Sequence, residues 1–225
     1  MAHVENGRRW LASLNLNAAV CSWSASGRFL ALLLLLLSPL TVLAFYLDRP
    51  MAQHFKPLFG GPLHLWAVRV TELGKADIYF GLAGLGFVLG LVLQRRLLRN
   101  QSAYALAALT VSGLLVQVLK HLVGRQRPYA DLHLEATRFD FVNSNYEWHS
   151  LPSGHSQVAF TVAATMVLLG PKRRAWQWSW FTVAAMIAMT RVVTLNHWLS
   201  DTLSGAFVGV LGTVLAFRLV KLERS

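Results

Sequence analysis

Six long apolar runs, each free of Asp, Glu, Lys and Arg, occupy most of the chain. They cover residues 29–47, 78–94, 100–119, 155–170, 175–190 and 202–217. A helix that crosses a bilayer needs about 20 mostly apolar residues, and Lys or Arg at the ends of the shorter runs can reach toward the membrane surface. One such run is also typical of a buried helix in a soluble protein. Six of them in 225 residues predict an all-α, polytopic membrane bundle with six transmembrane helices.

The first run has a second interpretation, because a secretory signal peptide is also apolar. Its length exceeds the roughly 7–15 apolar residues of a signal peptide, and no Ala-x-Ala site follows it. We therefore expect a retained helix and one integral membrane domain over residues 1–225. Residues 1–27 are predicted to be a cytoplasmic segment, and residues 49–76 and 121–153 outer-face loops. Segments 1–27 and 49–76 each carry apolar positions typical of a short helix at the membrane interface.

The distribution of charge gives the expected orientation. Two short turns, 95–100 and 171–175, hold six basic residues, and basic residues in short loops mark the cytoplasmic side. Both termini are then cytoplasmic. In this arrangement the inner segments hold 12 basic and two acidic residues, and the outer segments hold nine basic and eight acidic residues. Most of the net charge of +11 therefore follows from topology, and no nucleic-acid partner is expected.

Composition narrows the class of protein further. Only 14% of the residues are charged, against about 25% in soluble domains, and 55% are hydrophobic. A disordered chain is excluded, because it needs the opposite composition. The lone cysteine, Cys21, allows no intrachain disulfide and disfavours thiolate metal sites.

Three polar clusters stand at the predicted outer ends of the runs: Lys120 to Pro128, Pro152 to His155, and Thr190 to Asp201. Lys120, Arg127 and Arg191 could simply anchor helix ends at the interface. Together, however, three cations at one depth match a dianionic phosphate group, which arginine binds well.

The second cluster, Pro-Ser-Gly-His, is typical of a loop that enters a helix. A helix N-terminus binds anions through its free N–H groups and dipole. Gly154 permits close approach of a ligand, and Ser153 can cap the helix or offer its hydroxyl. His155 would stand in the first turn beside the anion. Simple helix capping explains the same residues, so this cluster alone is weak evidence for an anion site.

The third cluster places His197 and Asp201 four residues apart, on one helix face. A carboxylate there can hold one imidazole N–H and leave the other nitrogen free to react. A structural polar pair at a helix start is the alternative. Because ionisable residues next to membrane spans are functional candidates by default, we favour a functional pair.

In order and spacing, these clusters resemble the motifs of the type 2 phosphatidic acid phosphatase superfamily, which also includes vanadium haloperoxidases and glucose-6-phosphatase. The pattern K-x6-R-P, P-S-G-H and (S/T)-R-x5-H-x3-D spans residues 120–201. The third motif usually begins with Ser, whereas this chain has Thr190. The added methyl group leaves the Arg, His and Asp positions intact.

The resemblance implies a metal-independent and cofactor-independent phosphatase with a phosphohistidine intermediate. His197 would be the nucleophile, Asp201 would orient it, and His155 would act as general acid and later as general base. The phosphoryl oxygens would bind five residues: Lys120, Arg127, Ser153, Gly154 and Arg191. Since His197 must be neutral and His155 protonated, a bell-shaped pH profile is expected.

Three other functions are compatible with parts of the pattern. A metal hydrolase would use the outer-side histidines, including His121, His133 and His149. The chain has no H-E-x-x-H motif, and a cation-rich site repels metals. A haloperoxidase would hold vanadate in the same cage, but those relatives are typically soluble. A non-enzymatic transporter or scaffold would bind anionic lipid at the cations without hydrolysing it.

A site at the outer membrane surface indicates a phosphate on an anchored lipid. Candidates are undecaprenyl pyrophosphate, phosphatidylglycerol phosphate, phosphatidic acid and lipid A. The aromatic and acidic loop 129–151 is expected to shape headgroup choice, or else to cap the bundle. Short loops and basic inner turns are typical of a bacterial inner membrane protein with its site on the periplasmic or outer face.

Overall fold

The computed structural model describes residues 23–131, 133 and 138–222. The predicted interfacial helix in 1–27 lies almost entirely outside these residues. Seven α-helices follow one another along the described chain: α2 (Trp23–Phe55), α3 (Pro62–Thr71), α4 (Ala76–Val92), α5 (Arg96–Val123), α6 (Gly154–Leu169), α7 (Arg174–Val193) and α8 (Leu199–Leu222). Three short 3-10 helices, η1 (Lys56–Leu58), η2 (Glu72–Gly74) and η3 (Tyr146–Trp148), lie between them.

Each of the six predicted spans corresponds to one long helix: α2, α4, α5, α6, α7 or α8. The all-α prediction is therefore confirmed. Within the described residues, four segments are long and apolar enough to cross a membrane: Gly27–Leu58, Pro62–Val92, Arg96–Val123 and Leu199–Leu219. Helix α6 is a shorter apolar helix. That all six cross the bilayer stays a prediction.

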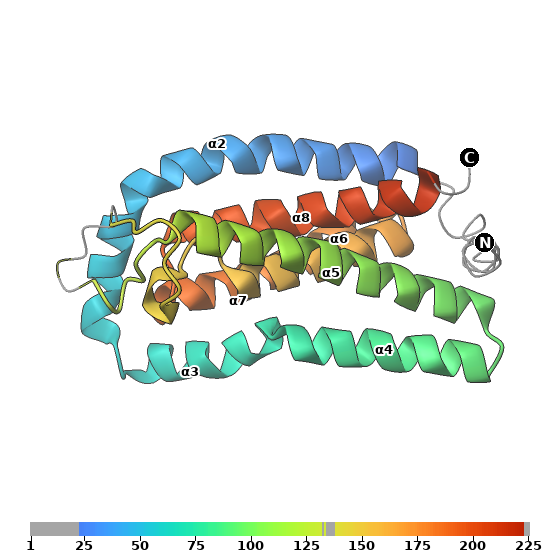
Figure 1. The fold of residues 1–225 in the computed structure, drawn as a ribbon, viewed down its shortest axis with the longest axis horizontal. Helices are drawn as coiled ribbons and strands as arrows, with labels where there is room; N and C mark the ends of the chain where they lie inside the picture. Colours follow the sequence, from blue (N-terminus) through green and yellow to red (C-terminus); the bar gives the residue numbers. More distant parts are fainter. Residues whose placement is uncertain (1–22, 132, 134–137, 223–225) are drawn as a thin grey trace.

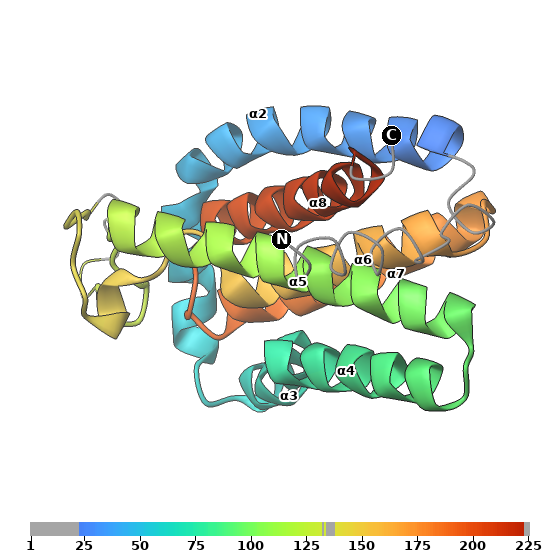
Figure 2. The same cartoon turned by 45° about the vertical axis from the view of Figure 1, so that its right-hand side comes forward.

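The long helices lie side by side, with α6 and α8 against most of the others (Figures 1 and 2). Helix α8 packs on α2, α5 and α6, and α6 also packs on α5 and α7. Small residues such as Ala163, Ala164 and Ala206 fill much of the contact among α2, α6, α7 and α8. Small side chains let membrane helices approach closely. The polar ends of these helices therefore lie close together.

The outer helices present their apolar side chains outward. Leu35 of α2 is 69% exposed and Val92 of α4 is 71% exposed, and many leucines of both helices are similar. A surface this apolar marks contact with a membrane or a partner. Together with the apolar helix lengths, it makes the chain an integral membrane protein.

The predicted outer segment 49–76 is helical over much of its length. Helix α2 runs to Phe55, beyond the predicted end of the first span, and α3 contains the apolar stretch expected to form a short helix. Helix α3 packs against α7, and η2 separates it from α4. This contact places Thr71 and Gly74 close to the polar end of α7.

A left-handed turn ends α5 and directs the chain into the long loop. Gly124 has φ +56°, and its N–H donates to the Lys120 carbonyl. A Cβ atom here would stand 1.7 Å from the Asp140 carbonyl oxygen. Only glycine satisfies both the dihedral angle and this contact. The turn brings Arg125 and Arg127 back over the ends of α7 and α8.

Candidate active site

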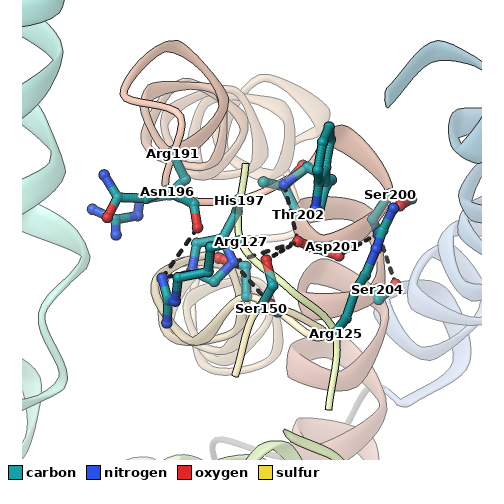
Figure 3. Close-up of polar contacts among 12 residues, drawn as sticks. Arg125, Arg127, Ser150, Arg191, Asn196, His197, Ser200, Asp201, Thr202 and Ser204 are labelled. Atoms are coloured by element: carbon teal, nitrogen blue, oxygen red, sulfur yellow. Dashed lines mark hydrogen bonds and ion pairs between the residues drawn. The ribbon is translucent and has the colours of Figure 1, made fainter. Parts of the chain in front are cut away.

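The three polar clusters meet at one end of the bundle, where α5 and α7 end and α6 and α8 begin. Figure 3 shows side chains of the first and third clusters at this end. Antiparallel neighbours place these four termini together. The N–H of Ser153, before α6, donates to the Asp201 carbonyl in the first turn of α8 at 2.9 Å. The described parts of the loop between α5 and α6 supply Arg127 and Ser150 to this end.

His197 lies in the short connection between α7 and α8 and is 2% exposed. Its Nδ1 is 2.8 Å from the Ser150 carbonyl oxygen, which can only accept a hydrogen bond. Its Nε2 is 3.3 Å from Nη1 of Arg127, which can only donate. These two contacts together require the neutral Nδ1–H tautomer, so Nε2 carries the lone pair and accepts from Arg127.

Asp201 lies near this imidazole without a short hydrogen bond to it, since Oδ2 is 3.7 Å from Nδ1. The carboxylate accepts instead from Nη1 of Arg125 at 2.6 Å, from the Ser150 hydroxyl at 2.5 Å and from the Trp198 N–H at 2.9 Å. Asp201 therefore acts on His197 through its charge and through Ser150. The sequence predicts that Asp201 holds the imidazole N–H; the structure instead gives this N–H to the Ser150 carbonyl and leaves Asp201 within ion-pair distance of the ring.

Burial and neighbouring charges set the protonation of His197. Burial is the largest cause and lowers the imidazole pKa well below its usual value, while Asp201 raises it and Arg127 and Arg191 lower it. The imidazole is thus neutral at physiological pH, as a nucleophilic nitrogen must be.

Arg127 is fixed by the loop around it. Its Nε donates to the Tyr146 carbonyl at 3.1 Å, Nη1 to the Asn196 carbonyl at 3.1 Å and Nη2 to the His149 carbonyl at 3.0 Å. The guanidinium carbon also lies 4.1 Å from the centre of the Tyr146 ring. These contacts hold the cation rigidly beside His197 Nε2, where a phosphoryl group would meet it.

Arg191 and Lys120 approach from two other helices. Arg191 is buried at the end of α7, with Nη1 donating to the Thr71 hydroxyl at 3.0 Å. Its Nε finds no hydrogen-bond partner within the described residues, and a buried donor of this kind calls for a ligand or water. The Nζ of Lys120 lies 3.6 Å from where a Cβ on Gly154 would stand, so the first and second clusters touch.

His155 faces the same group of cations. Arg191, Lys120, Arg127 and Lys75 are all close enough to act electrostatically on its ring. Ser153 is the N-cap of α6, and its hydroxyl accepts from Ser156 N–H at 3.5 Å.

Glycine 74 of η2 lets the chain lie directly on the His155 ring. A Cβ at this position would come within 3.0 Å of His155 Cδ2 and 2.9 Å of an Ile187 methyl group. The imidazole is thus confined between η2 and the start of α6.

A cavity of about 580 Å³ opens beside His155. Gly154, His155 and Gln157 of α6 form one wall, and Lys75 and Asp77 stand at its polar end. The remaining wall is mainly apolar and comes from α4 and α5, including Phe80, Leu109, Gly113 and Leu114. The cavity combines an apolar wall with an ionic end, as an amphiphilic ligand requires.

Three buried polar residues belong to this end of the molecule although the motifs do not contain them: Asp48, Arg125 and Ser150. Asp48 ends the first apolar run, and Arg125 stands between two motif cations, so both could be taken for interfacial anchors. The sequence feature that could have marked Asp48 and Arg125 as functional candidates is that both are ionisable and lie next to predicted spans. No group of three His, Cys, Asp or Glu in the described part of the chain is arranged to hold a metal.

Comparison with known proteins places this arrangement in a family. The family model described as "PAP2 superfamily" matches residues 101–225, which contain all three clusters. The chain belongs to the PAP2 superfamily. The type 2 phosphatidic acid phosphatase resemblance drawn from the motifs is thereby confirmed.

Named PAP2 relatives act on lipid phosphates. The chain is 33% identical over 109 residues to a lipid A 1-phosphatase of Rhizobium etli, covering 48% of this chain and 45% of that protein. It is 29% identical over 116 residues to an undecaprenyl-diphosphatase of Sulfolobus acidocaldarius, covering 48% of each. The chain thus spans about half the length of the curated relatives it matches.

Solved structures share the fold. A transmembrane PAP2-type phosphatidylglycerolphosphate phosphatase from Bacillus subtilis aligns with a TM-score of 0.61 at 20% identity, over 89% of this chain and 98% of that one. The LpxE structure of Aquifex aeolicus aligns with a TM-score of 0.56 at 20% identity, over 76% and 95%. At this identity the likeness establishes the membrane bundle alone.

Proposed function

We propose that this protein hydrolyses a phosphate or pyrophosphate group on a membrane lipid, at the outer face of the membrane, through a phosphohistidine intermediate. One observation carries the proposal. His197 presents an unprotonated Nε2 beside the fixed guanidinium of Arg127. The surrounding cations include Arg191, whose buried Nε has no hydrogen-bond partner in the described part of the chain. The site thus joins a nucleophile to a receptor for phosphoryl oxygens.

In the first step, Nε2 of His197 bonds to phosphorus and the bond from phosphorus to the lipid oxygen breaks. His155 gives its proton to that oxygen. Lys120, Arg127, Arg191 and the Gly154 N–H stabilise the charge on the phosphoryl oxygens, the main task in phosphoryl transfer. Ser153 caps the start of α6, and we assign its hydroxyl to the same phosphoryl oxygens.

In the second step, water attacks phosphorus and the bond to Nε2 breaks. His155 takes a proton from the water, so that inorganic phosphate leaves and both histidines return to their initial state. The negative charge of Asp201 favours the cationic form of His197 that exists between the steps. Splitting one hydrolysis into two transfers is ordinary nucleophilic catalysis.

The cavity beside His155 supports a lipid substrate. Its apolar wall from α4 and α5 would take a hydrocarbon chain within the bilayer, while the phosphate reaches the cations. The printed names of the relatives point first to lipid A and to undecaprenyl pyrophosphate. Phosphatidylglycerol phosphate and phosphatidic acid remain candidates.

The test is phosphate release by the purified protein in detergent, with the four lipids and a water-soluble phosphate ester. We expect wild-type protein to favour one lipid and His197→Gln to lose at least about 10³-fold of that rate, since the nucleophile is absent. Wild-type protein stopped during turnover should carry acid-labile phosphate, and His197→Gln should not.

Two results would refute the proposal. Unchanged turnover by His197→Gln would exclude this nucleophile. Binding of anionic lipid without any phosphate release from the panel would favour a transporter or scaffold.

A further inference from the structure

A carboxylate of α2, a helix that packs against α8, reaches the first turn of α8. Asp48 of α2 is 1% exposed. Its Oδ1 accepts from the Ser200 N–H at 2.8 Å, and its Oδ2 accepts from the Ser200 hydroxyl at 2.5 Å. Ser200 is in the first turn of α8, where backbone N–H groups have no partner within the helix. Asp48 therefore caps α8 from another helix.

Arg125 connects this carboxylate to Asp201. It is fully buried, with Nη2 donating to Asp48 at 2.7 Å and Nη1 donating to Asp201 at 2.6 Å and to the Ser200 hydroxyl at 2.7 Å. The rings of Phe45, Phe139 and Trp198 surround the guanidinium. Figure 3 shows Arg125 and Ser200 on the side of Asp201 away from Arg127.

The formal charges of this group matter for His197. Arg125 alone would cancel the charge of Asp201, which is the carboxylate nearest the imidazole. Asp48 adds a second negative charge, so that the three residues together carry −1. Water does not screen this charge, because all three side chains are buried. Electrostatic interactions are strong away from water.

The other ionisable groups around His197 are mostly cationic. Arg127 comes from the loop and Arg191 from α7. Lys120 of α5 interacts with Arg127, Arg191 and Asp201, and His155 of α6 faces the same cations. Tyr146 of η3 stacks on Arg127. Asp201 is the only carboxylate within the described residues that contacts the His197 ring closely enough to form an ion pair.

We infer that Asp48 is a positioning residue of the reaction: through Arg125 and Ser200 it fixes the first turn of α8 and restores the net negative charge behind His197. This inference rests on the proposed function, because the charge serves the cationic, phosphorylated form of His197. Asp48 itself touches neither the imidazole nor the phosphoryl site.

The variant Asp48→Asn keeps the size of the side chain and removes its charge. We expect kcat to fall about tenfold or more, the scale of a lost charge-assisted hydrogen bond, with KM little changed. The acid limb of kcat/KM should also move to lower pH, because a weaker negative charge near His197 disfavours its protonated form. We would measure kcat and kcat/KM from pH 3 to 8 with the preferred lipid.

A matched control separates positioning from stability. Tyr104→Phe removes another buried contact between helices, the bond from the Tyr104 hydroxyl to the Thr213 carbonyl at 2.8 Å, far from the site along α5 and α8. It should lower the thermal stability while leaving kcat and the pH profile unchanged. Asp48→Asn should change both kinetic properties even where its melting temperature matches that of Tyr104→Phe.

A double variant separates charge from shape. Asp48→Asn with Arg125→Gln removes both charges and leaves −1 on Asp201, as in the native group. The acid limb should return toward the wild-type position, even if kcat recovers only in part. If the double variant keeps the shift of the single variant, the charge argument is wrong.

An unchanged kcat and pH profile in Asp48→Asn would overturn the inference as a whole. His197→Gln, measured in parallel, distinguishes this failure from failure of the proposed function. An inactive His197→Gln with an unaffected Asp48→Asn rejects only the role of Asp48. An active His197→Gln rejects the phosphohistidine route itself.

Discussion

A backbone atom determines which imidazole nitrogen of His197 is unprotonated. The Ser150 carbonyl accepts from Nδ1 at 2.8 Å, and a carbonyl cannot lose this role through titration. The Ser150 hydroxyl simultaneously donates to Asp201. One residue therefore sets the tautomer of His197 and fixes the carboxylate behind it.

A pH prediction follows from this environment. Burial, Arg127 and Arg191 lower the His197 pKa below its usual value by more than Asp201 raises it. A lowered pKa means that the neutral, nucleophilic form persists as pH falls and is lost only below pH ~6.5, the ordinary histidine value.

We therefore expect the acid limb of kcat/KM, which reports the free enzyme, to lie well below pH 6.5. The measurement is phosphate release at low lipid concentration from pH 3 to 8. An acid limb at or above pH 6.5 would mean that His197 is not the group that must be deprotonated.

At the scale of the helices, the α6–α8 contact decides where the clusters stand. Gly205 faces the start of α6, and a Cβ on it would lie 2.3 Å from the Ser153 carbonyl oxygen and 3.0 Å from Ser156 Cβ. Gly209, one turn further, makes the same close approach to the Gln157 carbonyl. These contacts allow α6 to start directly beside Asp201.

Gly205→Val should therefore push the start of α6 away from α8. Because the obstructing atom is a backbone oxygen, the helices must separate, and overpacking of this kind costs about 1–3 kcal/mol. We expect a lower thermal unfolding temperature and a fall in kcat of about tenfold or more, since displacements near 1 Å are costly in catalysis.

Gly81→Val is the matched control for this variant. Gly81 lies in α4, and a Cβ there meets nothing within 4 Å, so both stability and turnover should stay near wild type. Equal loss in the two variants would show that valine in a membrane helix is harmful in general.

Much of this arrangement follows from the sequence, because local patterns encode it. Apolar runs located the six long helices, and the spacing within three short motifs identified Lys120, Arg127, His155, His197 and Asp201. Asp48 and Arg125 escaped prediction for a physical reason: they are 77 residues apart, and only the packing of α2 against α8 makes them partners. The relay through Ser150 likewise depends on how a long loop folds over the site.

At the scale of the whole molecule, the site adjoins a largely apolar cavity between two helices. The cavity beside His155 runs between α4 and α5, and both helices expose apolar side chains on their outer faces. A lipid could thus bring its phosphate to the cations while its hydrocarbon chain stays in apolar surroundings.

Filling this cavity should consequently affect lipids and spare small esters. Gly113 of α5 lines the cavity, and a Cβ on it meets nothing within 4 Å, so Gly113→Phe can place its ring where the hydrocarbon chain would lie. We expect KM for the preferred long-chain lipid to rise about tenfold, because the ring fills the space that the hydrocarbon chain would need and overpacking costs about 1–3 kcal/mol. Turnover of a water-soluble phosphate ester should stay unchanged, because the cations and both histidines are untouched.

Gly81→Phe, which adds the same ring to the open face of α4, controls for the effect of a bulky residue in a membrane helix. A Gly113→Phe protein that slows the ester as much as the lipid would instead indicate a distorted site, and one that slows neither would place the hydrocarbon chain elsewhere on the molecule.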